Sequence, residues 1–225
     1  MNAETETTQH TVFVTGATGY IASALMPALI ARGHHVRALV RRGAWKKLAA
    51  GALAIHGDAL DAASYREAIR PADTFVHLVG TRHPNPFKAA AFAQVDLVSI
   101  KAALAAALSA GVRHFIYLSV AQPAPIMAAY IAVRQQGEAL LRESGLAATI
   151  VRPWYVLGPG RSWPLLLGPI YGVLERLPAT REMAQRLGLV TITEMTAALM
   201  NAIENPPAKM QILNVPDIRA ATDGR

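Results

Sequence analysis

The stretch Thr11-Val12-Phe13-Val14-Thr15-Gly16-Ala17-Thr18-Gly19-Tyr20-Ile21-Ala22 decides the fold. Its first five residues form a short β-branched and aromatic run, which predicts a buried first strand. Helical character follows from Tyr20 to Arg32, so both glycines fall on a tight turn between a strand and a helix. The start of such a helix offers unpaired N–H groups and the positive end of its dipole to an anion. The stretch therefore predicts an anion site at this turn.

The spacing of the small residues in this turn indicates which anion it binds. Gly16 can adopt backbone angles that a Cβ would forbid, Gly19 leaves the backbone open to a pyrophosphate, and Ala22 allows close helix–strand packing. The first two glycines are one residue further apart than in the usual dinucleotide fingerprint, and an ordinary turn is the alternative. A complete β-α succession downstream favours dinucleotide binding. We expect the cofactor to contact this turn at Gly16, Ala17, Thr18, Gly19, Tyr20 and Ile21.

Composition narrows the class of protein. The chain has 225 residues, of which 52% are hydrophobic and 16% charged, so a single domain can bury a large core. It has no cysteine, which excludes a disulfide framework, a thiolate zinc site and a cysteine nucleophile. Absence of cysteine is compatible with a reducing compartment, and we expect a cytoplasmic location. We predict no metal site, because His34 and His35 are adjacent and should point apart.

The formal net charge of +7 could serve nucleic acid, an anionic membrane or an anionic cofactor. The positive charges are scattered, and no aromatic–basic interleaving occurs, so we do not expect nucleic-acid binding. We also expect no transmembrane segment, because the sequence has no uninterrupted run of the roughly 18 apolar residues that a spanning helix needs. The apolar residues between 164 and 177 could be core, a lid over a pocket, a dimer face of a homo-oligomer or a membrane contact.

Strand and helix patterns alternate along the first two thirds of the chain. This alternation predicts an α/β fold, a doubly wound parallel sheet with helices on both faces. From residue 153 onward the rhythm is broken by Pro and Gly, which predicts a small C-terminal lobe at 153–225 within one domain of residues 1–225. We expect strands at 11–15, 35–40, 53–56, 74–79, 114–119, 147–151, 189–192 and 211–215, and helices at 20–32, 62–70, 87–110, 130–144 and 194–204.

The end of the second expected strand bears on the choice of cofactor. An NAD-binding protein usually carries an acid there, which accepts hydrogen bonds from the ribose 2′-hydroxyl. This chain instead has Arg41 and Arg42, and an arginine fork suits a 2′-phosphate. A solvated basic turn is the alternative. The pattern predicts NADP(H), with NAD(H) less favoured.

Several stretches together resemble the short-chain dehydrogenase/reductase superfamily. They are most similar to its atypical branch, which includes nucleoside-diphosphate-sugar-epimerase-like, NmrA-like and complex I accessory-subunit-like proteins. The resemblance implies a Rossmann fold that binds a dinucleotide. The matching pieces are the glycine turn at 15–22, Gly57-Asp58, Tyr117-Leu118-Ser119, Tyr130 with its following helix, and Arg152-Pro153 leading to Gly158-Pro159-Gly160.

The resemblance also implies where the cofactor would lie. Asp58, followed by Ala59, would hydrogen-bond the adenine amino group, although a helix-capping or turn-forming aspartate is the alternative. The chain from Val79 through Gly80 to Thr81 would lie along the adenosine ribose. The backbone from Pro153 to Val156 would face the nicotinamide, and an unknown small molecule would bind beside it.

This chain differs from the superfamily pattern at the catalytic motif. The superfamily pattern is Tyr-x-x-x-Lys, and this chain has Tyr130-Ile131-Ala132-Val133-Arg134. The spacing still puts Tyr130 and Arg134 on one helix face. The implied roles are acid/base for Tyr130, electrostatic partner for Arg134 and oxygen-binding hydroxyl for Ser119.

The sequence leaves three candidate functions. The leading one is an oxidoreductase that moves hydride between NADP(H) and a small carbonyl or alcohol. The alternative is a non-catalytic NADP(H)-binding sensor or structural subunit, which the missing lysine favours. An epimerase or dehydratase acting on nucleotide sugars is disfavoured, because it usually needs a larger substrate lobe.

Overall fold

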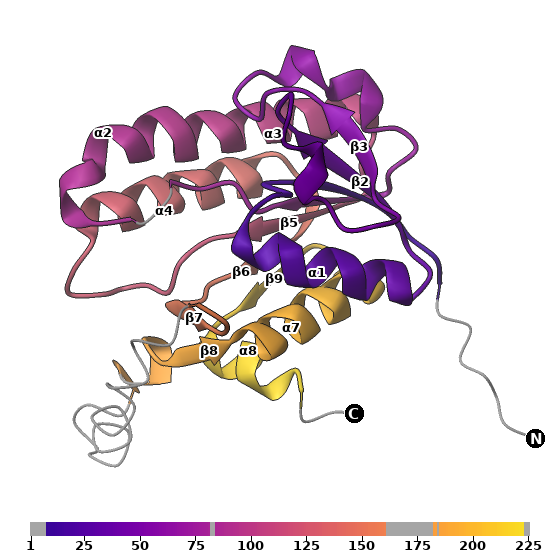
Figure 1. Ribbon diagram of the computed structural model, residues 1–225. Coiled ribbons are helices and arrows are strands. Elements are labelled where there is room, and N and C mark those ends of the chain that lie inside the picture. Colours follow the sequence, from indigo (N-terminus) through magenta and orange to yellow (C-terminus); the bar gives the residue numbers. More distant parts are fainter. Residues whose placement is uncertain (1–7, 82–83, 161–181, 184, 223–225) are drawn as a thin grey trace, which may run out of the picture.

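The computed structural model describes residues 8–81, 84–160, 182–183 and 185–222. Within these residues a seven-stranded parallel sheet has the strand order β3-β2-β1-β4-β5-β6-β9 (Figure 1). This order is doubly wound, and it confirms the predicted α/β class. The strands are β1 (Thr11–Thr15), β2 (His35–Val40), β3 (Leu53–His56), β4 (Thr74–His77), β5 (His114–Leu118), β6 (Ala147–Val151) and β9 (Met210–Leu213).

Helices cover both faces of the sheet, as the sequence predicted (Figure 1). On one face, α1 (Tyr20–Ala31) and α7 (Ile192–Glu204) pack side by side, and α8 (Val215–Ala220) joins α7. Leu25 and Leu199 are among the fully buried residues of this layer. On the other face, α3 (Val98–Ala110) and α4 (Ala128–Glu143) enclose a second core around stacked Phe75 and Phe115. The central strands are buried on both sides, which is why their sequences read as continuous apolar runs.

The region expected to be a helix at 62–70 is not one. It contains two separate 3₁₀ turns, η2 (Ala62–Ser64) and η3 (Arg66–Ala68). Tyr65 lies between them with φ −145°, outside the helical region. Its ring is buried and stacks on Phe13 with 5.8 Å between centroids. Packing of this aromatic side chain against β1 therefore overrides the local helical propensity.

The long helix expected at 87–110 is present but irregular. It starts as a 3₁₀ turn, η4 (Pro86–Lys88), continues through the short α2 (Ala89–Ala91), and then forms the π-helical segment η5 (Phe92–Leu97) before α3. π-helical turns of this kind are rare and are frequent at functional sites. In η5 the side chains of Phe92 and Asp96 are buried.

The whole of Pro86–Ala110 is long and apolar enough to cross a membrane by length and composition alone. The sequence reasoning had not anticipated this. Half of its most apolar window is buried within the protein, because the helix forms part of the second core. A core helix passes the same test, so this stretch is weak evidence for a membrane span.

Beyond residue 153 the chain only partly leaves the main sheet. β7 (Tyr155–Leu157) and β8 (Leu189–Thr191) pair in parallel as a separate two-stranded sheet, and β7 was not among the expected strands. α7 and β9 return to the main layers, where β9 pairs with β6. α8 was not expected either, and it begins at a capping box formed by Asn214 and Asp217. The apolar run at 164–177 lies outside the described residues.

Candidate functional site

The glycine turn joins β1 to α1 as predicted. Gly16 has φ +74°, and a Cβ there would lie 2.7 Å from the Leu78 carbonyl, so only glycine fits against the chain that follows β4. Gly19 caps α1 with extended backbone and no side-chain cap, and the first turn of α1 contains no acid. The N–H groups of this turn are therefore not capped by a side chain. The turn lies where β1 neighbours β4, which is the topological switch point of a doubly wound sheet and the place where such folds bind ligands.

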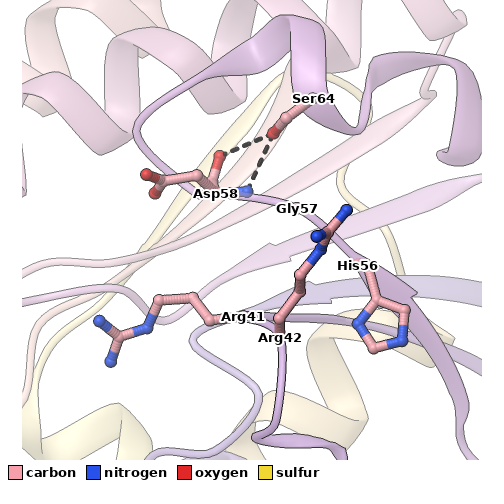
Figure 2. A pocket seen from close by; sticks show the side chains of 6 residues that line it. All are labelled: Arg41, Arg42, His56, Gly57, Asp58 and Ser64. Carbon is pink, nitrogen blue, oxygen red and sulfur yellow. Dashed lines mark hydrogen bonds between the residues drawn. The ribbon is translucent and has the colours of Figure 1, made fainter.

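A pocket of about 430 Å³ opens at the ends of β2 and β3. Figure 2 shows its lining, in which Arg41 and Arg42 diverge from the end of β2. Neither arginine forms an ion pair with any residue that the structure describes. Two unneutralised guanidinium groups in one pocket make it an anion-binding candidate. The lining residues are Arg41, Arg42, His56, Gly57, Asp58 and Ser64.

Asp58 forms a turn of its own and leaves one carboxylate oxygen open. Its Oδ1 accepts a hydrogen bond of 3.0 Å from the Leu60 N–H, which makes it a turn-forming aspartate across Ala59. The Ser64 hydroxyl fixes the same turn, because it accepts from the Asp58 N–H and lies within hydrogen-bond distance of the Asp58 carbonyl and, at 2.7 Å, of the Asp61 carbonyl (Figure 2). The second carboxylate oxygen has no partner among the described residues, so it can still accept a hydrogen bond from a ligand.

The residues after β4 are held by a carboxylate that the sequence reasoning missed. Thr81 donates to Asp96 Oδ2 through its backbone N–H at 3.1 Å and its hydroxyl at 2.5 Å. The position of Gly80 has no room for a side chain, because a Cβ there would collide with the Arg134 guanidinium. The Val79 carbonyl accepts a hydrogen bond from Arg134. The turn expected along the ribose is thus connected to α4.

Arg134 is deeply buried, with a side chain 2% exposed. Its Nη2 lies 2.6 Å from Asp96 Oδ1, and its Nη1 donates to the Leu118 carbonyl at 2.7 Å. The guanidinium therefore bridges the carboxyl ends of β4 and β5. Burial alone would lower the pKa of Arg134, but the nearby tyrosines and Asp96 outweigh it and raise that pKa. Arg134 is a permanent cation whose charge is largely compensated by Asp96.

Tyr130 lies close to this cation. It is half-buried in the first turn of α4, and the centre of its ring is 5.1 Å from Arg134 Cζ and 5.0 Å from the Phe92 ring. The spacing in the sequence therefore does bring Tyr130 and Arg134 together on one helix face. The Tyr130 hydroxyl makes no hydrogen bond with the described residues, so it can bond to a ligand.

Ser119 is engaged by a second missed carboxylate, Glu138. The Ser119 hydroxyl donates to Glu138 Oε1 at 2.7 Å, and Arg152 and Gln122 donate to the same oxygen. Burial would raise the pKa of Glu138, but hydrogen bonds from Arg152 and Ser119 outweigh it and hold that pKa below its usual value. Since a hydroxyl has one proton, Ser119 in this arrangement can accept a hydrogen bond from a ligand but cannot donate one.

The segment expected to face the nicotinamide follows β6. Pro153 is buried, and its carbonyl accepts a hydrogen bond of 3.0 Å from the Ala121 N–H. Val156 is a buried residue of β7. The ring of Tyr20, from the glycine turn, reaches Gly158 just beyond β7, where a Cβ would collide with its hydroxyl. Most of the predicted residues thus follow the carboxyl ends of strands of the main sheet, and Arg134 on α4 contacts the ends of β4 and β5. Val156 lies in the separate β7–β8 sheet.

A family model described as NAD(P)H-binding matches residues 16–161. The chain belongs to this NAD(P)H-binding family. The match covers the glycine turn, the pocket and the Tyr130 helix, and it confirms the resemblance to the atypical short-chain dehydrogenases/reductases that the motifs indicated.

Three curated proteins that are similar to this chain are named after a ceramide, a farnesylated quinoline oxide and a sterol. A ceramide reductase of Caulobacter vibrioides is 27% identical over 212 residues, which are 92% of this chain and 65% of the relative. A 4-hydroxy-2-methyl-3-oxo-4-farnesyl-3,4-dihydroquinoline-1-oxide ketoreductase of Stigmatella aurantiaca is 29% identical, over 65% of this chain and 50% of the relative. Sterol demethylase protein B of Methylococcus capsulatus is 28% identical, over 70% and 55%. The chain therefore spans only about half to two thirds of these relatives.

Solved structures support the fold. The Bordetella bronchiseptica enzyme WbmH, in complex with NAD⁺, superposes with a TM-score of 0.69 at 20% identity, over 92% of this chain and 75% of WbmH. The UDP-glucose 4-epimerase of Thermus thermophilus, complexed with NAD, gives 0.65 at 17% identity, over 94% and 82%. At these identities the likeness establishes the Rossmann-type fold.

Proposed function

We propose that the protein is an NADP(H)-dependent oxidoreductase that interconverts a carbonyl and an alcohol on a lipophilic substrate. Membership of the NAD(P)H-binding family supplies the dinucleotide. Two of the curated relatives are named reductases, of ceramide and of a farnesylated quinoline oxide, and the third is named for a sterol. These names support a hydrophobic carbonyl or alcohol as the substrate class. A cytoplasmic location is part of the same proposal.

The observation that carries the choice of NADP(H) is the pocket at the ends of β2 and β3. The chain after Val40 presents Arg41 and Arg42, and neither pairs with an acid of the described residues. A carboxylate at the end of β2, which would accept from a ribose 2′-hydroxyl, is missing. The acid that does line the pocket, Asp58, is held in its own turn after β3. This charge pattern suits a 2′-phosphate, which would carry up to two negative charges.

The residues present fit a dinucleotide along the rest of the carboxyl edge. Gly16 and Gly19 leave the α1 terminus open to a pyrophosphate, and Pro153 and Val156, which would face the nicotinamide, are buried apolar residues. When bound, the cofactor supplies the hydride. The protein's contribution is to position the substrate and to move the proton.

Tyr130 is the residue we assign to the proton. Its hydroxyl has no partner among the described residues, and its ring faces the Arg134 cation. During reduction of a carbonyl the phenol would donate its proton to the developing alkoxide, and Arg134 would stabilise the negative charge left on Tyr130. Ser119 would accept a hydrogen bond from the hydroxyl of the alcohol form of the substrate, because its own proton is committed to Glu138.

A specific observation favours a second candidate, a non-catalytic NADP(H)-binding sensor or structural subunit. Asp96 compensates the charge of Arg134, and Glu138 occupies the Ser119 hydroxyl. Both interactions weaken the help that these two residues could give to a reaction. Cofactor binding alone would require neither of them.

One experiment separates the two candidates. Calorimetry with NADPH and NADH would first measure cofactor affinity, and NADPH consumption would then be followed with a panel of long-chain and polycyclic ketones and aldehydes. The oxidoreductase proposal expects tight NADPH binding and turnover of at least one hydrophobic carbonyl, which Tyr130→Phe lowers by roughly 10²–10⁴-fold. Tight NADPH binding with no turnover across the panel would establish the sensor or structural candidate instead.

A further inference from the structure

His56 lines the cofactor pocket, yet none of the roles above uses it. It is the last residue of β3, and the β2–β3 register places it opposite Val40, the last residue of β2. The pairing continues with a hydrogen bond of 3.1 Å from the Gly57 N–H to the Val40 carbonyl. Arg41 and Arg42 follow Val40 directly. Two neighbouring strand ends therefore bring an exposed imidazole and two guanidinium groups to one pocket.

The charged groups around His56 are few. Arg41 and Arg42 follow β2, the one strand that pairs with β3 among the described residues, and in Figure 2 Arg42 extends on the side of His56 while Arg41 extends to the other side. Asp58 follows His56 on its own chain. In Figure 2 the Asp58 carboxylate and the His56 ring point to opposite sides of the pocket. Ser64 also lines the pocket, but its hydroxyl is occupied by the turn around Asp58. Asp58 therefore does not neutralise the imidazole.

This set of donors suits one anion with several acceptor oxygens, which is the chemistry of a phosphate monoester. Two arginines can balance its two negative charges, and an imidazole offers one further N–H donor. A protonated imidazole also adds a positive charge, and histidine is the side chain that ordinarily changes its charge between pH 5 and 8.

We propose that His56 is a third ligand of the 2′-phosphate of NADP(H), and that it binds this phosphate most strongly when its imidazole is protonated. The inference rests on the proposed NADP(H) preference and adds a dependence on pH to it. The preference for NADPH over NADH increases as pH falls from 8.5 to 6.5. Below about pH 6 the phosphate itself takes up a proton, which opposes the effect.

The test uses two ligands that differ only in the 2′-phosphate, 2′,5′-ADP and 5′-AMP, measured by calorimetry at pH 8.5 and 6.5. For the wild-type chain we expect the affinity for 2′,5′-ADP to rise about 5–10-fold at the lower pH, the size of one exposed charge-assisted hydrogen bond. The affinity for 5′-AMP should change less than about 2-fold. His56→Gln, an exposed substitution, should remove the pH effect on 2′,5′-ADP. His35→Gln is the control, because His35 is exposed at the other end of β2.

A second measurement does not depend on affinity. Addition of 2′,5′-ADP at pH 7.5 should move the His56 C–H resonance toward its protonated position, and 5′-AMP should leave it unchanged. Retention of wild-type affinity and pH dependence by His56→Gln would overturn the proposal, and so would equal losses for both ligands.

The proposed function fails by a different result. If the wild-type chain binds 2′,5′-ADP no better than 5′-AMP at either pH, the NADP(H) preference itself is wrong. If that preference exists, is abolished by Arg41→Asp and is untouched by His56→Gln, only the role of His56 is overturned.

Discussion

Arg134 Nη2 lies 2.6 Å from Asp96 Oδ1, with the side chains 2% and 0% exposed. The pair joins α4 to the π-helical segment η5, and Thr81 donates to the same carboxylate. A buried ion pair of this kind contributes little net stability, but removal of one partner leaves the other charge buried and unpaired. The arginine in the Tyr-x-x-x-Arg motif therefore holds α4 and η5 together, in addition to any role in catalysis.

The first prediction concerns the stability of this pair. Arg134→Met should lower the free energy of unfolding by about 3–5 kcal/mol, because it leaves Asp96 as an unpaired buried charge. Arg142→Met is the matched control on the same helix, where a half-exposed arginine pairs with Glu138, and it should cost no more than about 1 kcal/mol. Urea titration of each purified variant provides the values.

A double variant tests the cause of that loss. Asp96→Asn combined with Arg134→Met removes the unpaired charge, so it should be more stable than Arg134→Met alone. If the double variant loses the sum of the two single effects, the sites are independent and the ion-pair explanation is wrong.

The second prediction concerns Tyr130 and its cation. Tyr130→Phe removes the proton-carrying oxygen and retains the ring contacts to Phe92 and Arg134. Turnover of a responsive carbonyl should fall by roughly 10²–10⁴-fold, with little change in NADPH affinity, because one acid/base group is lost. Arg134→Lys keeps the positive charge and should preserve turnover if charge is all that the position supplies. Stopped-flow measurement of NADPH oxidation compares the variants.

The fold could be predicted from the sequence because its signals are local. β1, β2, β3 and β6 have the predicted bounds, since each is a short apolar run next to a turn residue. The carboxylates Asp96 and Glu138 could not be found in this way. Each lies on a helix with ordinary polar spacing, and only the folded structure shows that it is buried against an arginine. The 3₁₀ turns around Tyr65 were missed for the same reason, because the Phe13 contact that imposes them is distant in the sequence.

The third prediction tests the glycine turn. Gly19→Val should abolish NADPH binding while the protein remains folded, because the added side chain occupies the space next to the α1 N–H groups. The backbone at Gly19 is extended, with φ −80°, so valine can adopt it, although its Cβ would lie 3.0 Å from the Gly16 carbonyl oxygen. Ser23→Val, at an exposed position one turn further along α1, controls for the β-branched side chain. Calorimetry measures affinity and circular dichroism verifies the fold. Unchanged affinity in folded Gly19→Val would exclude the turn as the phosphate site.

The fourth prediction is a loss of stability in mild acid. Burial lowers the pKa of His77 to about 3, with a further contribution from Arg134, and burial lowers that of His114 to about 4. Both pKa values lie below the ordinary value of about 6.5, so the unfolded chain takes up these protons first. The free energy of unfolding is therefore highest above about pH 6.5. It declines as pH falls towards the pKa values of the two histidines in the folded protein, by up to about 1.4 kcal/mol per pH unit for each histidine.

Between about pH 6.5 and 4.5 the carboxyls Asp73 and Glu138 contribute little to this decline, because their pKa values lie below the ordinary values. Urea titrations across this window should show the decline. His114→Asn should reduce its slope, and His35→Gln, at an exposed position, should not. A flat profile for the wild-type chain would mean that neither buried histidine remains neutral in the folded state.

The last prediction concerns the choice of cofactor at Arg41. In the pocket at the end of β2, Arg41 has no ion-pair partner among the described residues, so its full charge is available to a 2′-phosphate. Arg41→Asp removes a charge-assisted hydrogen bond, typically worth about 1.5–3 kcal/mol, and adds a repulsive carboxylate. NADPH affinity should therefore fall by at least about 10-fold. NADH affinity should be unchanged or slightly improved, because aspartate can accept from the 2′-hydroxyl.

Lys46→Asp is the control for the change in net charge, since Lys46 is an exposed neighbour that does not line the pocket. Equal losses of NADPH and NADH affinity in Arg41→Asp, or a wild-type preference for NADH, would show that the basic turn is a solvated surface and that the 2′-phosphate is not recognised there.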